Sequence, residues 1–257
     1  MDLGLAGKVG LVTGASRGIG RAITEVLGAE GMRLALVARS RSLLEELAAA
    51  LPTEAIVIAV DLRDSQAPAA AVAAAVECFG GLDVLVNNAG ATKRGDFLTL
   101  PDSDWEDGFA LKFYGAMRCS RAAWPHLQRS GGAIVNVVGV GGRTGSAEFA
   151  IGGSVNAACL NLTKCLADRG VMDGVRVNAI NPGSIATERL EGRVRRFASE
   201  RGLDESAAAE ELARAMRVSR FGEPDEIARV AAFLASPRAS YCQGVVMDVD
   251  GGLTRTL

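Results

Sequence analysis

Short apolar segments alternate with longer segments of helical periodicity along almost the whole chain. The apolar segments have the length of buried strands, and the longer segments have the length of helices. Continuous apolar runs such as residues 55–60 indicate strands that are buried on both faces. We therefore expect strands at residues 9–13, 34–38, 55–60, 84–86, 133–138, 175–180 and 245–248, and helices at residues 18–30, 43–50, 69–79, 103–128, 154–169 and 224–235.

This alternation of strands and helices requires a parallel sheet with right-handed crossovers. A polar, arginine-rich helical stretch, residues 188–216, interrupts it near the end. No internal repeat, low-complexity tract or linker divides the chain. The sequence predicts an α/β protein, a Rossmann-type doubly wound parallel sheet flanked by helices, as a single domain over residues 1–257.

Composition narrows the possible classes of protein. A length of 257 residues with 49% hydrophobic residues suits one domain with a large core. The net charge of −2 gives no reason to expect nucleic acid or a membrane as partner. His126 is the only histidine, which argues against a metal site and a Ser-His-Asp triad. With scattered cysteines and neither a signal peptide nor a transmembrane segment, we expect a soluble, cytoplasmic protein.

A glycine-rich turn follows the first predicted strand and leads directly into a helix. The segment runs from Thr13 to Gly20 and contains Gly14 and Gly18. Glycines at such a junction let the backbone approach a pyrophosphate, which then lies at the helix N-terminus. A glycine pattern alone fits a helix-packing turn equally well, but the position between strand and helix favours a nucleotide site.

The end of the second strand indicates which nucleotide is preferred. Arg39 lies there, and no Asp or Glu is available to bind a ribose 2′-hydroxyl. Arg39, with Ser16 and Arg17, could bind a 2′-phosphate through charge-assisted hydrogen bonds. This predicts NADP(H) in preference to NAD(H). The alternative is that Arg39 is only a solvated charge at a helix start.

Five segments in this order resemble the short-chain dehydrogenase/reductase family, and the resemblance covers essentially the whole chain. The segments are Thr13–Gly20, Asp61, Asn87–Gly90, Asn181–Gly183 and Val249–Gly252. The resemblance implies an oxidoreductase that acts on a carbonyl or alcohol substrate. Combined with the turn and Arg39, it gives the expected cofactor-binding set Gly14, Ser16, Arg17, Gly18, Ile19, Gly20, Arg39, Asp61, Leu62, Asn88, Ala89, Gly90, Pro182, Gly183, Ile185 and Thr187.

The proton relay of this family, usually Asn, Ser, Tyr and Lys, is expected to be replaced. Neither of the two tyrosines of the chain, Tyr114 and Tyr241, stands four residues before a lysine, so no shift of the alignment restores the relay. An ungapped alignment places Lys112, Gly139, Gly152 and Asn156 at the four positions, in that family order.

Lys112 and Asn156 are the candidate catalytic residues. A lysine with a pKa lowered by burial can donate a proton, or its charge can hold an anionic group. The alternative is a lysine that extends from its helix to solvent. Asn156 can supply neutral hydrogen bonds, for example to the nicotinamide ribose. The glycines leave space for a larger substrate or for a side chain from elsewhere.

Three functions follow from these expectations. The first is an NADP(H)-dependent oxidoreductase in which Lys112 or a water replaces the phenol. The second is an NADP(H)-binding sensor or partner subunit without redox chemistry, and the third is an enzyme of another reaction class. The resemblance favours the first, with an unidentified small-molecule substrate. It also implies a homo-oligomer, a tetramer or a dimer.

Overall fold

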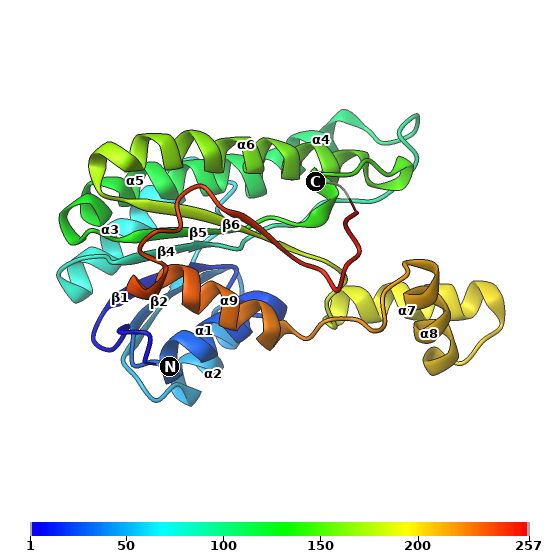
Figure 1. Cartoon of the computed structure of the whole chain (residues 1–257), viewed down its shortest axis with the longest axis horizontal. Coiled ribbons are helices and arrows are strands. Elements are labelled where there is room, and N and C mark those ends of the chain that lie inside the picture. Colours follow the sequence, from blue (N-terminus) through cyan, green and yellow to red (C-terminus); the bar gives the residue numbers. More distant parts are fainter. Residues whose placement is uncertain (1, 256–257) are drawn as a thin grey trace.

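Seven parallel strands form one sheet in the order β3-β2-β1-β4-β5-β6-β7 (Figure 1). The computed structural model describes residues 2–255. Each of the seven strands lies where the hydrophobic pattern predicts it, within one or two residues at each end. The strands are β1 (Val9–Thr13), β2 (Arg33–Ala38), β3 (Ala55–Ala59), β4 (Val84–Asn87), β5 (Ala133–Val137), β6 (Arg176–Pro182) and β7 (Val246–Val249).

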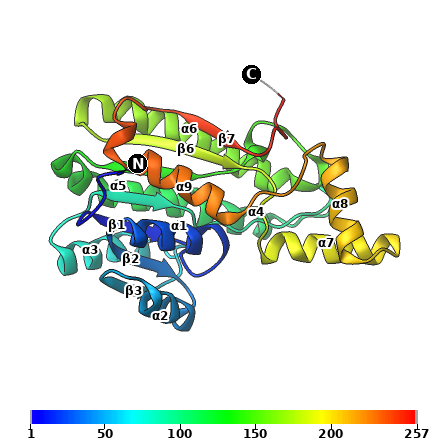
Figure 2. The same cartoon turned by 60° about the horizontal axis from the view of Figure 1, so that its bottom comes forward.

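Helices cover both faces of the sheet (Figures 1 and 2). One face carries α1 (Gly18–Ala29), α2 (Arg41–Ala50) and α9 (Pro224–Ala235), and α1 packs against α9. The opposite face carries α3 (Ala67–Phe79), α5 (Gly115–Ser130) and α6 (Ala150–Asp173). The predicted doubly wound α/β fold is confirmed.

The core consists of these two helix layers and the apolar strands between them. In α1, Ile23, Thr24 and Leu27 are fully buried, and this spacing of three and four residues gives the helix one core-facing side. All five residues of β1 are buried, as expected for a central strand covered on both faces. The sheet therefore holds the ends of its strands in fixed positions.

The predicted helix at residues 103–128 is wrong in one respect. The chain is helical throughout, but it consists of α4 (Asp102–Gly108), the π-helical segment η1 (Phe109–Tyr114) and α5. A π-helix has one more residue in each turn than an α-helix. Such segments are rare in proteins, and those that occur are often at functional sites. Local periodicity does not reveal it. Helix α6 also begins earlier and ends later than residues 154–169.

The arginine-rich stretch forms two helices, α7 (Glu188–Arg201) and α8 (Glu205–Ala215), which project beyond the sheet (Figure 1). They pack on each other through a small apolar cluster that includes Leu190, Val194 and Leu212. Short 3₁₀ turns complete the structure at Val140–Gly142 (η2), Ala147–Phe149 (η3) and Pro237–Ala239 (η4). Between residues 2 and 255, no helix combines the length and apolar character needed to cross a membrane.

Candidate functional site

The strand order reverses between β1 and β4, and the glycine turn leaves β1 at this point. In doubly wound sheets, ligands bind at such a switch point, beyond the carboxyl ends of the strands. Gly14 has a φ of +67°, and a Cβ at Gly20 would lie 2.1 Å from the Gly14 carbonyl oxygen. Only glycine permits this close turn. Ser16 and Ile19 are half-buried within it, between β1 and α1.

The loop after β4 is hydrogen-bonded to the glycine turn and to the end of β1. The Asn88 side-chain amide donates hydrogen bonds to the carbonyl oxygens of Thr13 (3.1 Å) and Gly14 (3.2 Å). The Thr13 hydroxyl accepts from the backbone N–H groups of Asn88 (2.9 Å) and Ala89 (3.1 Å). Asn88 and Ala89 therefore lie beside the turn, as expected for a joint nucleotide site.

The end of β6 and the segment after it lie against the glycine turn. Pro182 ends this strand, and Gly183 lies so close to Asp250 that a Cβ would come within 2.8 Å of its Cα. Ile185 is buried in a short bridge to residue 222. The Thr187 methyl group lies 3.2 Å from the ideal Cβ position of Gly18. The structure thus brings the segment 182–187 against the glycine turn.

Among the expected cofactor-binding residues after β2 and β3, the structure shows two different arrangements of charge. Arg39 is exposed at the end of β2 and forms no ion pair with any described carboxylate. Asp61 instead accepts hydrogen bonds from Arg63, whose guanidinium also binds Asp107 of α4. Leu62 is buried beneath this network.

Arg17 does not lie free beside Arg39. Its guanidinium donates hydrogen bonds to both carboxylate oxygens of Glu188, at 2.8 and 2.6 Å. Glu188 begins α7, so this exposed ion pair joins the glycine turn to the projecting helices. To bind a 2′-phosphate, Arg17 would have to leave Glu188, whereas Arg39 needs no such change.

Lys112 lies in the π-helical segment and points into the site. Its ammonium donates a 2.5 Å hydrogen bond to the Val138 carbonyl oxygen at the end of β5, and its aliphatic chain packs against Gly90. Burial lowers the pKa of Lys112 to about 8. The positive charge of Arg189 acts in the same direction, and Cys159 opposes both. The alternative, a lysine that extends into solvent, is therefore not what the structure shows.

Asn156 is buried in α6 beside the same strand end. Its Oδ1 has no hydrogen-bond partner among the described residues. Its Nδ2 lies 3.1 Å from the ideal Cβ position of Gly139, which follows β5 with a φ of +133°. A buried amide oxygen without a donor costs stability, so a ligand hydroxyl or a water is needed there.

The phenyl ring of Phe149 fills the space above Gly152. A Cβ at Gly152 would lie 2.0 Å from the Phe149 Cζ, and one at Gly141 would lie 2.8 Å from the same ring. The Arg94 guanidinium stacks on the ring, 4.2 Å from its centroid. Of the two possibilities for this space, a larger substrate or another side chain, the structure shows the side chain.

We expect Gly152→Ala to destabilise the protein by roughly 1–3 kcal/mol, because the new methyl group would overlap the Phe149 ring. Urea unfolding followed by circular dichroism measures the change in free energy of unfolding. Phe149→Ala in the same background removes the ring and should recover part of the loss. Such a recovery would show that the loss comes from this contact and not from a changed helix propensity at residue 152. A Gly152→Ala variant as stable as the parent would contradict this packing.

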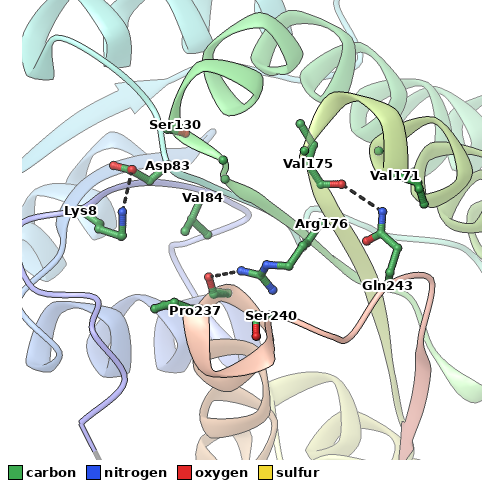
Figure 3. Close-up of a pocket in the computed structure, with 15 residues that line it drawn as sticks. Lys8, Asp83, Val84, Ser130, Val171, Val175, Arg176, Pro237, Ser240 and Gln243 are labelled. Atoms are coloured by element: carbon green, nitrogen blue, oxygen red, sulfur yellow. Dashed lines mark hydrogen bonds and ion pairs between the residues drawn. The ribbon is translucent and has the colours of Figure 1, made fainter.

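An open hollow of about 570 Å³ lies at the opposite, amino-terminal edge of the sheet (Figure 3). The Lys8 ammonium pairs with Asp83 there at 3.1 Å, and Gln243 donates to the Val175 carbonyl oxygen at 3.1 Å. Arg176 donates to the carbonyl oxygens at the end of α9. These polar groups satisfy each other, so the hollow does not share the chemistry of the Lys112 region.

Sequence reasoning gave no role to two features of the site. Phe149 carries no motif, and its position depends on how η3 folds back onto α6. The arginines of α7 were recognised only as part of a polar stretch. Their spacing, Arg189, Arg193 and Arg196, is the helical signal that would have placed them on one face.

Taken together, the switch-point turn, the Asn88 side chain hydrogen-bonded to it and the neighbouring lysine have the arrangement of a nucleotide site in a doubly wound sheet. The family profile described as enoyl-(acyl carrier protein) reductase matches residues 14–254. The chain belongs to the short-chain dehydrogenase/reductase family, and it is a short-chain dehydrogenase/reductase-like enzyme.

Similar proteins match over nearly their full length. The chain is 39% identical to the short-chain reductase protein NovJ of Streptomyces niveus, covering 95% of this chain and 93% of that protein. It is 33% identical to the 3-oxoacyl-[acyl-carrier-protein] reductase FabG of Vibrio cholerae, covering 98% and 99%. The structure of L-sorbose reductase from Gluconobacter frateurii, complexed with NADPH and L-sorbose, superposes with a TM-score of 0.95 at 33% identity, covering 100% of each chain.

Proposed function

We propose that the protein is an NADP(H)-dependent oxidoreductase that acts on a carbonyl or alcohol substrate and uses Lys112 as its proton donor. The observation that carries this proposal is the half-buried Lys112 ammonium, which donates to the Val138 carbonyl oxygen at the end of β5 and has a lowered pKa. Perturbed titratable groups in a cleft are typical of catalytic sites. The similarity to reductases supports the redox chemistry.

The residues present fit a dinucleotide. Because the turn has glycines where a Cβ would clash, its backbone is open to the phosphates of a cofactor. Asn156 Oδ1, which has no hydrogen-bond partner among the described residues, can accept a hydrogen bond from a ribose hydroxyl. Arg39 is exposed and has no ion-pair partner among residues 2–255, which supports a 2′-phosphate and hence NADP(H). We propose that the phosphates lie at the turn, between residues 14–20, that residues 88–90 support the ribose next to the adenine, and that residues 182–187 hold the nicotinamide half.

Lys112 would perform the proton transfer that a phenol performs elsewhere in the family. When bound, the reduced cofactor supplies a hydride to the carbonyl carbon. The Lys112 ammonium donates a proton to the carbonyl oxygen, so that an alcohol and a neutral amine result. Because burial lowers the pKa of Lys112 to about 8, the proton is present at neutral pH and is released more easily than from an exposed lysine.

The proposal includes the replacement of the usual relay. Gly139 and Gly152 carry no side chain that could orient a carbonyl group, and the Phe149 ring covers Gly152. These features also favour the second candidate function, an NADP(H)-binding sensor or partner subunit without turnover. In that case Lys112 would stabilise the site without donating a proton.

A cofactor titration followed by a turnover screen distinguishes the two functions. We expect NADPH fluorescence to report tight binding, and we expect NADPH oxidation with at least one member of a broad aldehyde, ketone and keto-acid panel. Thermal unfolding with each cofactor provides an independent measure of binding. Tight binding without oxidation of NADPH by any compound would favour the sensor or partner-subunit function.

We propose further that the protein forms a homo-oligomer, a tetramer or a dimer. Val171, which lines the hollow of Figure 3, is 67% exposed, and two residues next in sequence to its lining residues, Met172 and Tyr241, are 85% and 103% exposed. Exposed apolar patches on a folded protein are typical of association surfaces. Light scattering at micromolar concentration should give two or four times the mass of one chain. A monomer mass would contradict this proposal.

A further inference from the structure

Three arginines form a stripe along one face of α7. Arg189, Arg193 and Arg196 are spaced by four and three residues, which places them on the same side of the helix. A different side, with Leu190 and Val194, packs against α8. The stripe is therefore not required for packing of the two projecting helices.

This stripe faces the region around Lys112. The Arg189 guanidinium donates a 3.0 Å hydrogen bond to the Gly90 carbonyl oxygen, and Gly90 contacts the Lys112 side chain. On the other side of the same region, Arg94 lies on the Phe149 ring. We call Arg94, Arg189, Arg193 and Arg196 the arginine cluster.

The positive charge of the arginine cluster is not neutralised by ion pairs. None of its four guanidinium groups pairs with a carboxylate within residues 2–255, and Glu148 is the one acidic side chain whose charge affects the pKa values of Arg94 and Arg193. Burial, followed by the charge of Arg193, lowers the pKa of Arg94. The members of the cluster therefore repel one another in the protein alone.

Such an arrangement is unfavourable for the helix itself. Like charges three or four residues apart on a helix destabilise it. Some other surface arginines are paired, as Arg214 with Glu210 and Arg229 with Asp225, whereas others, such as Arg39, form no ion pair among residues 2–255. What distinguishes the cluster is that its four arginines lie together beside the site, an arrangement that suits the binding of an anion.

We propose that the arginine cluster binds an anionic group, a carboxylate or a phosphate, of the substrate whose carbonyl faces Lys112. This inference rests on the proposed function and names the class of substrate. Arginine binds both groups with paired, charge-assisted hydrogen bonds. The cofactor phosphates have their own partners in the glycine turn and Arg39, whereas the cluster surrounds the Gly90, Lys112 and Phe149 side of the site.

Matched pairs of small ketones test this proposal. The carboxylate pair is 4-oxopentanoate and its neutral amide, 4-oxopentanamide, and the phosphate pair is dihydroxyacetone phosphate and dihydroxyacetone. Saturation-transfer NMR measures their affinities for the protein saturated with NADP⁺, so that no turnover occurs. We expect at least one anion to bind about tenfold more tightly than its neutral counterpart, and the stronger pair identifies the anionic group.

Variants of the cluster separate substrate binding from other effects. The double variant Arg193→Gln/Arg196→Gln should abolish the preference for the anion, and NADP⁺ affinity should change less than twofold. Arg195→Gln, which removes one charge from another side of α7, should keep the preference. The proposal is overturned if neither anion binds better than its neutral partner, if Arg195→Gln has the same effect, or if the double variant loses NADP⁺ affinity in parallel. Failure of the proposed function would appear separately, as absent NADP⁺ binding or absent NADPH oxidation.

Discussion

Lys112→Met is expected to reduce NADPH-dependent turnover by about a hundred- to ten-thousand-fold, the range found when a positioned general acid is removed. Methionine keeps much of the aliphatic stem that packs against Gly90 but cannot donate a proton or hold a charge. NADPH affinity, measured by fluorescence titration, should change little, because the glycine turn and Arg39 are untouched. Steady-state kinetics with the best substrate of the panel gives the turnover.

Two further variants show what Lys112 supplies. Lys112→Arg keeps the positive charge, but a guanidinium does not release its proton near neutral pH. It should therefore be as inactive as Lys112→Met if proton donation is required, and active if charge alone is required. Lys93→Met, which removes an exposed lysine paired with Asp104, is the matched control and should keep its turnover. Unchanged turnover in Lys112→Met would move the chemistry to another group.

The parent protein is expected to bind NADPH at least about tenfold more tightly than NADH, and Arg39→Asp should reverse the preference. The guanidinium of Arg39 can bind the 2′-phosphate, whereas an aspartate would repel it and accept a hydrogen bond from the 2′-hydroxyl of NADH. Arg39 is exposed and unpaired, so the substitution breaks no ion pair among residues 2–255. Fluorescence titration of both cofactors measures the four affinities.

A charge control accompanies this variant. Arg129→Asp makes the same change at the amino-terminal edge of the sheet and should leave the cofactor preference unaltered. Equal affinities of the parent for NADPH and NADH would refute the role of Arg39. A preference for NADPH that persists in Arg39→Asp would assign the 2′-phosphate to Ser16 or to an Arg17 released from Glu188.

The sheet could be predicted because each strand is recognisable from its own short stretch of sequence. A run such as Ala55–Ala59 is apolar throughout, and its flanking segments have helical periodicity. The glycine turn is equally local, since Gly14 and Gly20 are six residues apart and must approach each other closely. The π-helical segment at Phe109–Tyr114 could not be predicted, because the same residues form an α-helix equally well without tertiary contacts.

Residues of the candidate site could be predicted only where they belong to, or align with, a sequence motif. Lys112 was found because it occupies a position aligned with the family relay, although its pKa depends on burial that the sequence does not show. Arg17 was expected at the nucleotide, yet it pairs with Glu188, a residue distant in sequence. The Phe149 ring over Gly152 depends on the fold of a short 3₁₀ turn. These long-range contacts are set by tertiary packing, which single-residue patterns do not encode.

The pH dependence of NADPH oxidation tests the central claim, proton donation by Lys112, most directly. The ammonium is the active form and its pKa is lowered to about 8, so the rate should be constant below that pH and fall by about tenfold per pH unit above it. Single-turnover measurements from pH 6 to pH 10 should show this decrease in the parent, and the residual activity of Lys112→Arg should not follow it. A parent rate that stays constant to pH 10, or an identical profile in Lys112→Arg, would contradict the assignment of Lys112 as the proton donor.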